Sequence, residues 1–137
     1  MTAGDASAPV VVADTTRAYR VLETTHPPSW YLPRADVRPG TLVRSGWRST
    51  TCEWKGAATY WDVVGPAGLL LQAAAWSYER PTERFAPIAG YVSFMPALVE
   101  CRIDGELVRP QAGGFYGGWI TDDVVGPFKG EPGTWGW

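Results

Sequence analysis

The spacing of apolar and polar residues along this chain of 137 residues is typical of strands and turns. No stretch repeats apolar residues at the spacing of an amphipathic helix with capping residues at its ends. Short runs rich in β-branched and aromatic residues alternate instead with glycine, proline and aspartate, which form turns. The pattern predicts a mainly β fold, with strands at residues 10–13, 18–23, 30–32 and 41–44.

The clearest hairpin signal lies at residues 99–109, where Asp104 and Gly105 supply the two positive-φ positions of a tight turn. A two-residue loop at that point places Cys101 opposite Val108 and on the apolar face of its strand. We interpret Cys101 as a buried core residue. The alternative is a reactive thiol.

A second hairpin is predicted over residues 58–78, with its loop at residues 65–68. The large side chains of Trp76 and Tyr78 alternate along the returning strand with small ones. One face of this strand therefore carries large aromatic side chains. The other face allows a ligand or another backbone to approach closely.

The register of that hairpin decides which aromatic residues share a face. A four-residue loop without a bulge pairs Val64 with Leu69. Trp61 then shares a face with Trp76, and Tyr60 lies on the opposite face. A single bulge would exchange Trp61 and Tyr60.

The two ends of the chain differ in composition from the rest. Residues 1–8 are small and polar, which predicts a disordered N-terminus. Residues 112–137 combine closely spaced glycines with tryptophan and phenylalanine. We expect so aromatic a segment to pack on the sheet as an extended strap, within a single domain over residues 9–137.

Composition excludes several classes of partner. The formal net charge is −2 and the arginines are scattered, so neither nucleic acid nor an anionic membrane surface is expected. The apolar stretches are too short to span a membrane, and the first residues lack the features of a secretory signal. Only two cysteines occur, far apart in sequence. These features predict a cytoplasmic protein and leave a homodimer open.

No metal or cofactor site is expected. His26 is the only histidine, and Cys52 and Cys101 are single, so no set of zinc ligands is visible. No glycine-rich phosphate loop opens a helix. A nucleophilic dyad would have to join one of the cysteines to His26. Because His26 precedes two prolines in a predicted loop, a surface or capping histidine is the more common outcome.

Lysine occurs at only two positions, and both have similar neighbours. Lys55 and Lys129 each follow an aromatic residue and precede a glycine. An ammonium in this setting can hold a carboxylate or phosphate, can act as a nucleophile when desolvated, and can make a nearby Cys52 more reactive. It can equally cover the ring at a turn without binding a ligand. We regard Lys55 as the candidate ligand-binding residue. Lys129 is interpreted as a clasp, that is, a residue that anchors the C-terminal strap.

Several ordered blocks of this sequence resemble the family catalogued as domain of unknown function 427. The blocks are Pro28-Ser29-Trp30-Tyr31-Leu32-Pro33 with Asp36-Val37, Thr51-Cys52-Glu53-Trp54-Lys55-Gly56-Ala57 with Tyr60, Ala75-Trp76-Ser77-Tyr78 with Pro81, and Ile88-Ala89-Gly90-Tyr91-Val92-Ser93-Phe94. The ending is similar to longer bacterial members through Gly118-Trp119-Ile120-Thr121, Val125-Gly126-Pro127-Phe128-Lys129-Gly130 and Pro132-Gly133-Thr134. Glu53 departs from the resemblance, since the family usually has proline there.

The resemblance implies a small antiparallel β fold similar to the tent-like sheets of methionine sulfoxide reductase B and the ligand-binding domain of cereblon. Those proteins usually hold zinc, but the cysteine pairs that would bind it are absent from this chain. The family has no assigned function. Its nucleotidyltransferase label finds no paired carboxylates at a glycine-serine turn in this sequence.

The leading hypothesis is a small-molecule pocket at the mouth of the sheet, with Lys55 as its polar anchor. Its predicted members are Trp54, Lys55, Tyr60, Trp76, Tyr78, Arg80, Tyr31 and Cys52. Most of the eight tryptophans are expected in the core. A protein-interaction module built on exposed aromatic residues and the strap is the first alternative. An enzyme that uses Lys55 or Cys52 as nucleophile is the second.

Overall fold

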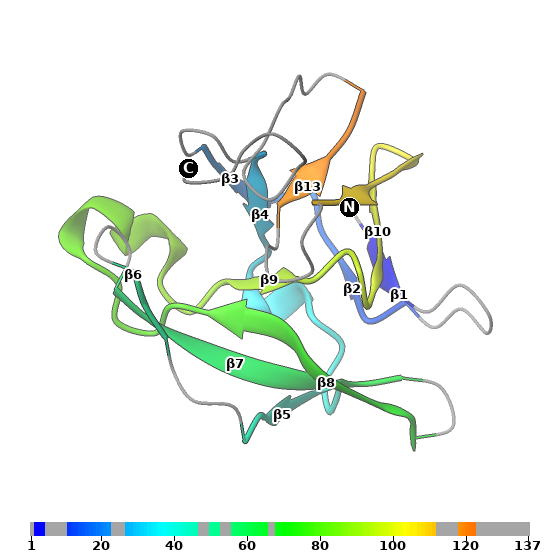
Figure 1. Cartoon of the computed structure of the whole chain (residues 1–137), viewed down its shortest axis with the longest axis horizontal. Coiled ribbons are helices and arrows are strands. Elements are labelled where there is room, and N and C mark those ends of the chain that lie inside the picture. Colours follow the sequence, from blue (N-terminus) through cyan, green and yellow to red (C-terminus); the bar gives the residue numbers. More distant parts are fainter. Residues whose placement is uncertain are drawn as a thin grey trace, which may run out of the picture.

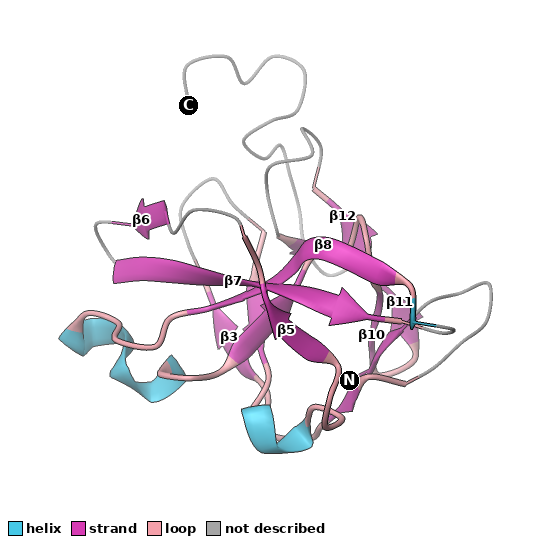
Figure 2. Ribbon diagram, turned by 90° about the horizontal axis from the view of Figure 1, so that it is seen from below, coloured by secondary structure: helices cyan, strands magenta, loops and turns pink. Residues whose placement is uncertain are grey.

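The computed structural model describes residues 2–4, 11–22, 27–46, 50–52, 56–65, 68–111 and 118–122, with the backbone alone at 2–4 and 50–52. These residues form antiparallel sheets connected by turns and short 3-10 helices (Figures 1 and 2). The prediction of a mainly β fold is therefore confirmed.

A five-stranded sheet contains the long strands β7 and β8, which cross the lower half of the molecule in Figure 1. Its strands follow the order β5-β7-β8-β9, and β6 pairs with the beginning of β7. Their bounds are β5 (Leu42–Arg44), β6 (Thr50–Cys52), β7 (Gly56–Val64), β8 (Leu70–Ser77) and β9 (Val92–Phe94). The strand predicted at residues 41–44 and the hairpin predicted at 58–78 are both present.

A smaller sheet continues this one at the edge of β9. It pairs β3 (Tyr19–Val21) with β4 (Ser29–Tyr31). Leu32 and Val92 exchange backbone hydrogen bonds of 2.8 and 2.9 Å, which join the end of β4 to β9. The 3-10 helix η1 (Arg34–Asp36) follows β4, and η3 (Glu83–Ile88) lies between β8 and β9 in sequence.

The N-terminal residues differ from the prediction of disorder. Residues 2–4 form β1 (Thr2–Gly4), which lies between β10 (Glu100–Ile103) and β2 (Ala13–Asp14) in a sheet of order β11-β10-β1-β2. The prediction rested on the small polar side chains of this segment. Strand pairing depends instead on backbone hydrogen bonds, and β1 pairs with a strand on each side. Residues 1 and 5–8 lie outside the described part of the chain.

The predicted hairpin at residues 99–109 is confirmed. It joins β10 to β11 (Glu106–Leu107) through Asp104 and Gly105, whose φ angles are 50° and 85°. Two successive positive φ angles match the right-handed twist of the flanking strands. The Val108 N–H donates to the Cys101 carbonyl at 2.9 Å, as the predicted register requires.

Part of the predicted C-terminal strap packs as a strand. Here β13 (Trp119–Ile120) pairs with β12 (Arg109–Pro110). The Trp119 side chain is fully buried, and its Nε1–H donates to the Phe94 carbonyl at 3.0 Å. The Trp119 backbone N–H donates to the Pro28 carbonyl at 2.8 Å. Residues 112–117 and 123–137 lie outside the described part.

The register of β7 and β8 differs from the one predicted without a bulge. Val64 pairs with Leu70, because the loop closes one residue later, with the Gly65 N–H donating to the Leu69 carbonyl at 2.6 Å. A bulge on β8 follows between Trp61 and Val63 of β7. Tyr60 consequently lies opposite Trp76, whereas Trp61 lies opposite Ala75. The predicted faces of Tyr60 and Trp61 are thus exchanged.

The small-residue face of β8 is covered by a side chain of the same sheet. The Trp61 Nε1–H donates to the buried Ser77 hydroxyl at 2.9 Å. The Arg34 guanidinium lies 4.9 Å from the centre of the Trp61 ring and pairs with Glu79 at 2.9 Å. Small residues on this face therefore make room for the Trp61 indole.

Buried side chains form a cluster on each face of the sheet. Trp61 packs against a first core cluster that contains Ala75, Phe94, Cys101 and Trp119. The neighbouring residue Tyr60 packs against the second cluster, which we call the aromatic cluster: Val21, Tyr31, Ala58, Trp76, Tyr78 and Ile88. Because consecutive residues of a strand point to opposite faces, the two clusters lie on opposite sides of β7.

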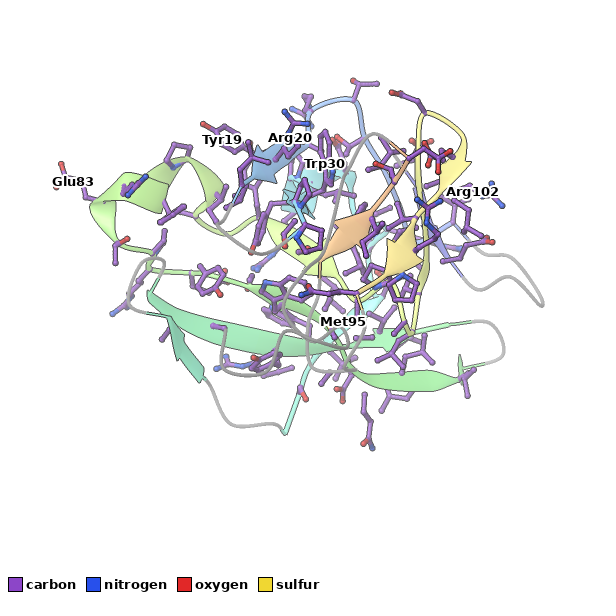
Figure 3. The ribbon with its side chains drawn as sticks, turned by 45° about the horizontal axis from the view of Figure 1, so that its top comes forward. Tyr19, Arg20, Trp30, Glu83, Met95 and Arg102 are labelled. Atoms are coloured by element: carbon purple, nitrogen blue, oxygen red, sulfur yellow. The ribbon has the colours of Figure 1, made fainter. Side chains whose placement is uncertain are left out.

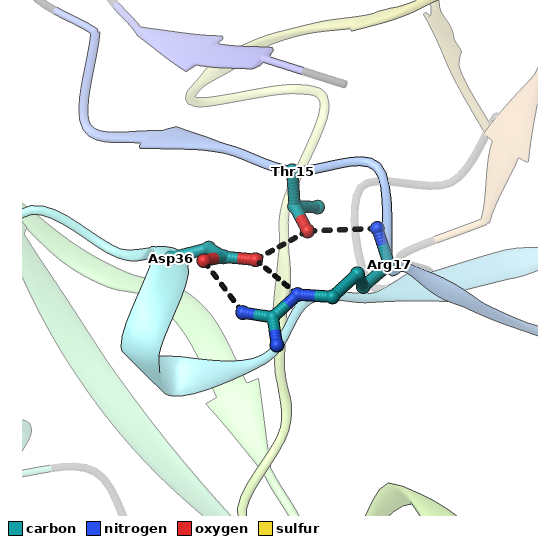
Figure 4. A network of polar contacts seen from close by, with 3 residues as sticks. All are labelled: Thr15, Arg17 and Asp36. Carbon is teal, nitrogen blue, oxygen red and sulfur yellow. Dashed lines mark hydrogen bonds and ion pairs between the residues drawn. The ribbon is translucent and has the colours of Figure 1, made fainter.

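A polar network joins η1 to the loop that follows β2 (Figure 4). The Asp36 carboxylate accepts hydrogen bonds from the Thr15 hydroxyl and the Arg17 guanidinium, and Arg17 Nη2 lies 2.8 Å from Asp36 Oδ1. The contacts with Arg17 and then Thr15 lower the pKa of Asp36 below its ordinary value of 3.8. The charged form of Asp36 is therefore favoured in the folded protein.

We predict that Asp36→Asn lowers the melting temperature at pH 7 but not at strongly acidic pH. A carboxyl pKa that is lower in the folded state contributes stability above its ordinary value of 3.8, and this contribution disappears as pH falls through the folded value. Thermal unfolding followed by circular dichroism at a series of pH values will test this. A gap between wild type and variant that stays constant down to about pH 2 would contradict it.

Candidate functional site

The aromatic residues of the predicted pocket converge at one end of the sheet. Tyr31 comes from β4, Trp76 lies near the end of β8, and Tyr78 is the first residue after that strand. The Tyr31 and Trp76 rings meet edge to face at 6.2 Å, and the Trp76 Nε1–H donates to the Tyr31 hydroxyl at 3.1 Å. The Tyr31 and Tyr78 ring centres lie 6.3 Å apart. The structure thus brings these three predicted residues together.

These three side chains are packed rather than open to solvent. Their exposed fractions are 1% for Tyr31, 8% for Trp76 and 6% for Tyr78. Tyr60 is half-buried against them, and Arg80 is exposed. The three side chains therefore pack against one another and are not open to a ligand from solvent.

The connection between β6 and β7 begins and ends beside this cluster. Cys52 pairs with Gly56 across the hairpin, and Ala58, two residues later, belongs to the aromatic cluster. Gly56 has φ of 107°, and a Cβ there would lie 3.2 Å from the Arg80 carbonyl oxygen. Only glycine combines that backbone angle with so close an approach.

Several predicted residues lie outside the described part of the chain. They are Trp54 and Lys55 within the β6–β7 connection, the side chain of Cys52, and His26 and Lys129. The anchoring role of Lys55, the Cys52–His26 dyad and the clasp formed by Lys129 remain predictions.

A cavity of about 170 Å³ opens at the edge of the aromatic cluster, between β3 and η3. Val21 and Ile88 of the aromatic cluster form part of its lining, and both are buried. The other lining residues are Tyr19, Arg20, Leu22, Arg84, Phe85 and Pro87. A Cβ at Gly56 would meet the backbone of residues 80–82, so the beginning of β7 lies close to the segment that leads into η3.

Both cationic residues of this cavity lie over aromatic rings. The Arg20 guanidinium is 5.8 Å from the centre of the Trp30 ring, and Figure 3 shows the two side by side. The Arg84 guanidinium is 5.9 Å from the centre of the Phe85 ring. Neither guanidinium forms an ion pair with another described residue. Their donors can therefore serve an anionic group.

The residues of this cavity were not identified from the sequence. Arg20 and Arg84 lie more than sixty positions apart, on a strand and a 3-10 helix that meet only through tertiary packing. The alternation around Tyr19 to Leu22 predicted a strand but gave no partner for it. No pattern in the sequence indicated that β3 and η3 lie next to each other.

Cys101 is a core residue. Its side chain is fully buried, and its thiol lies 3.3 Å from the Val99 carbonyl. Burial raises the pKa of the Cys101 thiol well above its ordinary value, so the reactive thiolate is disfavoured. Among the described residues, no three histidine, cysteine or acidic side chains are placed to hold a metal ion.

The described part of the chain contains no helix long and apolar enough to cross a membrane. No curated protein matches the chain at a significant level. A family model described as Domain of unknown function (DUF427) matches residues 6–108, a span that includes the aromatic cluster and the cavity and ends before β12. The chain therefore belongs to the DUF427 family.

Proposed function

We propose that this protein binds a small molecule that carries an acidic group and an apolar part. The cavity between β3 and η3 is the observation that carries the proposal, because Arg84 and several apolar residues line it together. The guanidinium of Arg84 would bind the acidic group, with Arg20 of β3 adding positive charge at the edge of the cavity. Leu22, Phe85 and Pro87 would contact the apolar part.

The size of the cavity limits the ligand. Its volume of about 170 Å³ is below the ~300–1,000 Å³ typical of sites for drug-sized molecules. A fragment such as an aromatic carboxylate or a phosphate monoester therefore fits better than a nucleotide. The packed aromatic cluster below it provides a rigid base, which lowers the cost of ordering the site on binding.

Lys55 is proposed as a further cation of this site. Its neighbour Gly56 lies against the Arg80 carbonyl, and the chain enters η3 at Glu83. A third positive charge at this end of the sheet would strengthen binding of a carboxylate or phosphate.

A protein-interaction surface is the second candidate function. Tyr19 and Leu22 on the rim of the cavity are 48% and 65% exposed. Exposed apolar residues beside a cavity also occur where a protein partner binds. Light scattering over a concentration series separates the two functions, because self-association through this rim would weaken on changing Leu22 to Ser.

We predict that Arg84→Met weakens binding of phenyl phosphate and benzoate at least about tenfold, the effect of losing one charge-assisted hydrogen bond. Methionine keeps the apolar stem of Arg84 over Phe85 and removes only the charge. Lys55→Ala should weaken binding similarly while the melting temperature stays nearly unchanged. Isothermal titration calorimetry with both probes will measure the affinities.

Arg38→Met is the matched control, because Arg38 is an exposed arginine that does not line the cavity. It should bind both probes as tightly as the wild type does. Equal affinity of the wild type and Arg84→Met would contradict the proposed site. A large loss of stability in Lys55→Ala would instead assign Lys55 a structural role.

A further inference from the structure

A second hollow lies on the face of the five-stranded sheet that carries the aromatic cluster, towards the loop between β7 and β8. It has a volume of about 330 Å³ and is lined by Ser45, Gly46, Asp62 and Gln72. Tyr60 and Asp62 are two residues apart on β7 and so point to the same face. The hollow is thus separate from the cavity at η3 and shares no lining residue with it.

The bulge on β8 holds the Asp62 carboxylate in place. Ala73 has a φ of 49°, a conformation that residues other than glycine rarely adopt. Its N–H consequently leaves the strand pairing and donates to Asp62 Oδ1 at 2.8 Å. A strained residue thus fixes one oxygen of the carboxylate at the wall of the hollow.

The charge of Asp62 is not balanced by the described residues. Asp62 is only 8% exposed, yet no arginine in the described part of the chain forms an ion pair with it. Arg44 on the adjacent strand lies opposite Trp61, with its guanidinium 6.0 Å from that ring and on the other face of the sheet. A buried carboxylate without a counterion is costly, so a cation is the group that this hollow favours.

The lining of the hollow is polar, but aliphatic side chains lie beside it on the neighbouring strands. Val43 lies directly opposite Asp62 across β5 and β7, and its side chain is 46% exposed. Leu70 pairs with Val64, two residues along β7 from Asp62, and is 44% exposed. A cationic group bound at Asp62 would therefore place any substituent against aliphatic side chains.

We propose that this hollow binds a primary ammonium group carried by a small apolar substituent. The Asp62 carboxylate is its counterion, and the Gln72 side-chain carbonyl is a second acceptor. Val43 and Leu70 contact the substituent.

Titration with n-butylammonium chloride, followed by the backbone amide resonances in ¹H–¹⁵N spectra, tests this proposal. The amides of Gly46, Gln72 and Ala73 are expected to shift saturably in the wild type. Asp62→Asn should weaken the apparent affinity at least about tenfold, since it removes the charge. Asparagine retains an acceptor for the Ala73 N–H, so the bulge and the dispersion of the spectrum should persist.

Asp104→Asn is the control of equal charge change, because Asp104 lies in the turn between β10 and β11 and asparagine tolerates its positive φ. It should bind n-butylammonium as the wild type does. Neutral n-butanol should produce no saturable shift of these amides. The proposal is overturned if Asp62→Asn binds as tightly as the wild type, if butanol matches the cation, or if the shifts rise without saturation.

Discussion

Trp119→Ala is expected to lower the free energy of unfolding by about 3–5 kcal/mol, the range for truncating a buried aromatic side chain. Trp119 is fully buried in the first core cluster, and its indole donates to the Phe94 carbonyl. Truncation leaves a cavity and an unpaired carbonyl in the same place. Urea denaturation followed by circular dichroism gives the free energy directly.

Trp119→Phe separates the two contributions, because it keeps a ring in the core and removes the N–H donor. We expect a smaller loss of about 1–3 kcal/mol, the cost of leaving a buried acceptor unpaired, together with some loss of packing. If Trp119→Ala unfolded at the same urea concentration as the wild type, residues 118–122 would not pack on the first core cluster. The result matters for the family, because the DUF427 match ends at residue 108 and Trp119 lies beyond it.

Local signals in the sequence were sufficient where the structure depends on local geometry. The hairpin at residues 99–109 was predicted correctly because the conformation of Asp104 and Gly105 fixes the register of β10 and β11. The burial of Cys101 followed from that register together with strand alternation. Neither inference needed information from distant parts of the chain.

The register of β7 and β8 could not be predicted in the same way. It depends on a loop that closes between Gly65 and Leu69, and on a bulge that the Asp62 carboxylate stabilises through the Ala73 N–H. Alanine gives no sequence signal for a positive φ angle. The register without a bulge therefore placed Tyr60 and Trp61 on the wrong faces, and the alternative with a bulge is the one that the structure shows.

The candidate site was predictable in part. Alternating aromatic residues and the family resemblance pointed to Tyr31, Trp76 and Tyr78, which the structure brings together. Their alternation could not show that they pack against one another. The charged residues Arg20 and Arg84 were missed, because their proximity arises only when η3 folds back towards β3.

Gly118→Ala is expected to destabilise the protein by roughly 3 kcal/mol, at the upper end of the usual cost of overpacking. A Cβ at this position would overlap Pro27 Cγ, and would lie 2.6 Å from Gln111 Oε1 and 2.9 Å from Pro27 Cδ. A proline ring cannot rotate away as a flexible side chain can, so the backbone before β13 must move instead. That movement would pull Trp119 from its contacts with the Pro28 and Phe94 carbonyls.

Gly46→Ala is the matched control, because a Cβ at Gly46 would meet no atom within 4 Å and the backbone angle there is ordinary. It should change the free energy of unfolding by no more than about 0.5 kcal/mol. The double variant Pro27→Ala with Gly118→Ala tests the cause, since removing Cγ and Cδ of Pro27 relieves the contacts with the rigid ring and leaves only the one with the end of the Gln111 side chain. The double variant should be clearly more stable than the sum of the two single losses predicts. Strictly additive losses would place the origin of the Gly118 effect elsewhere than in its contact with Pro27.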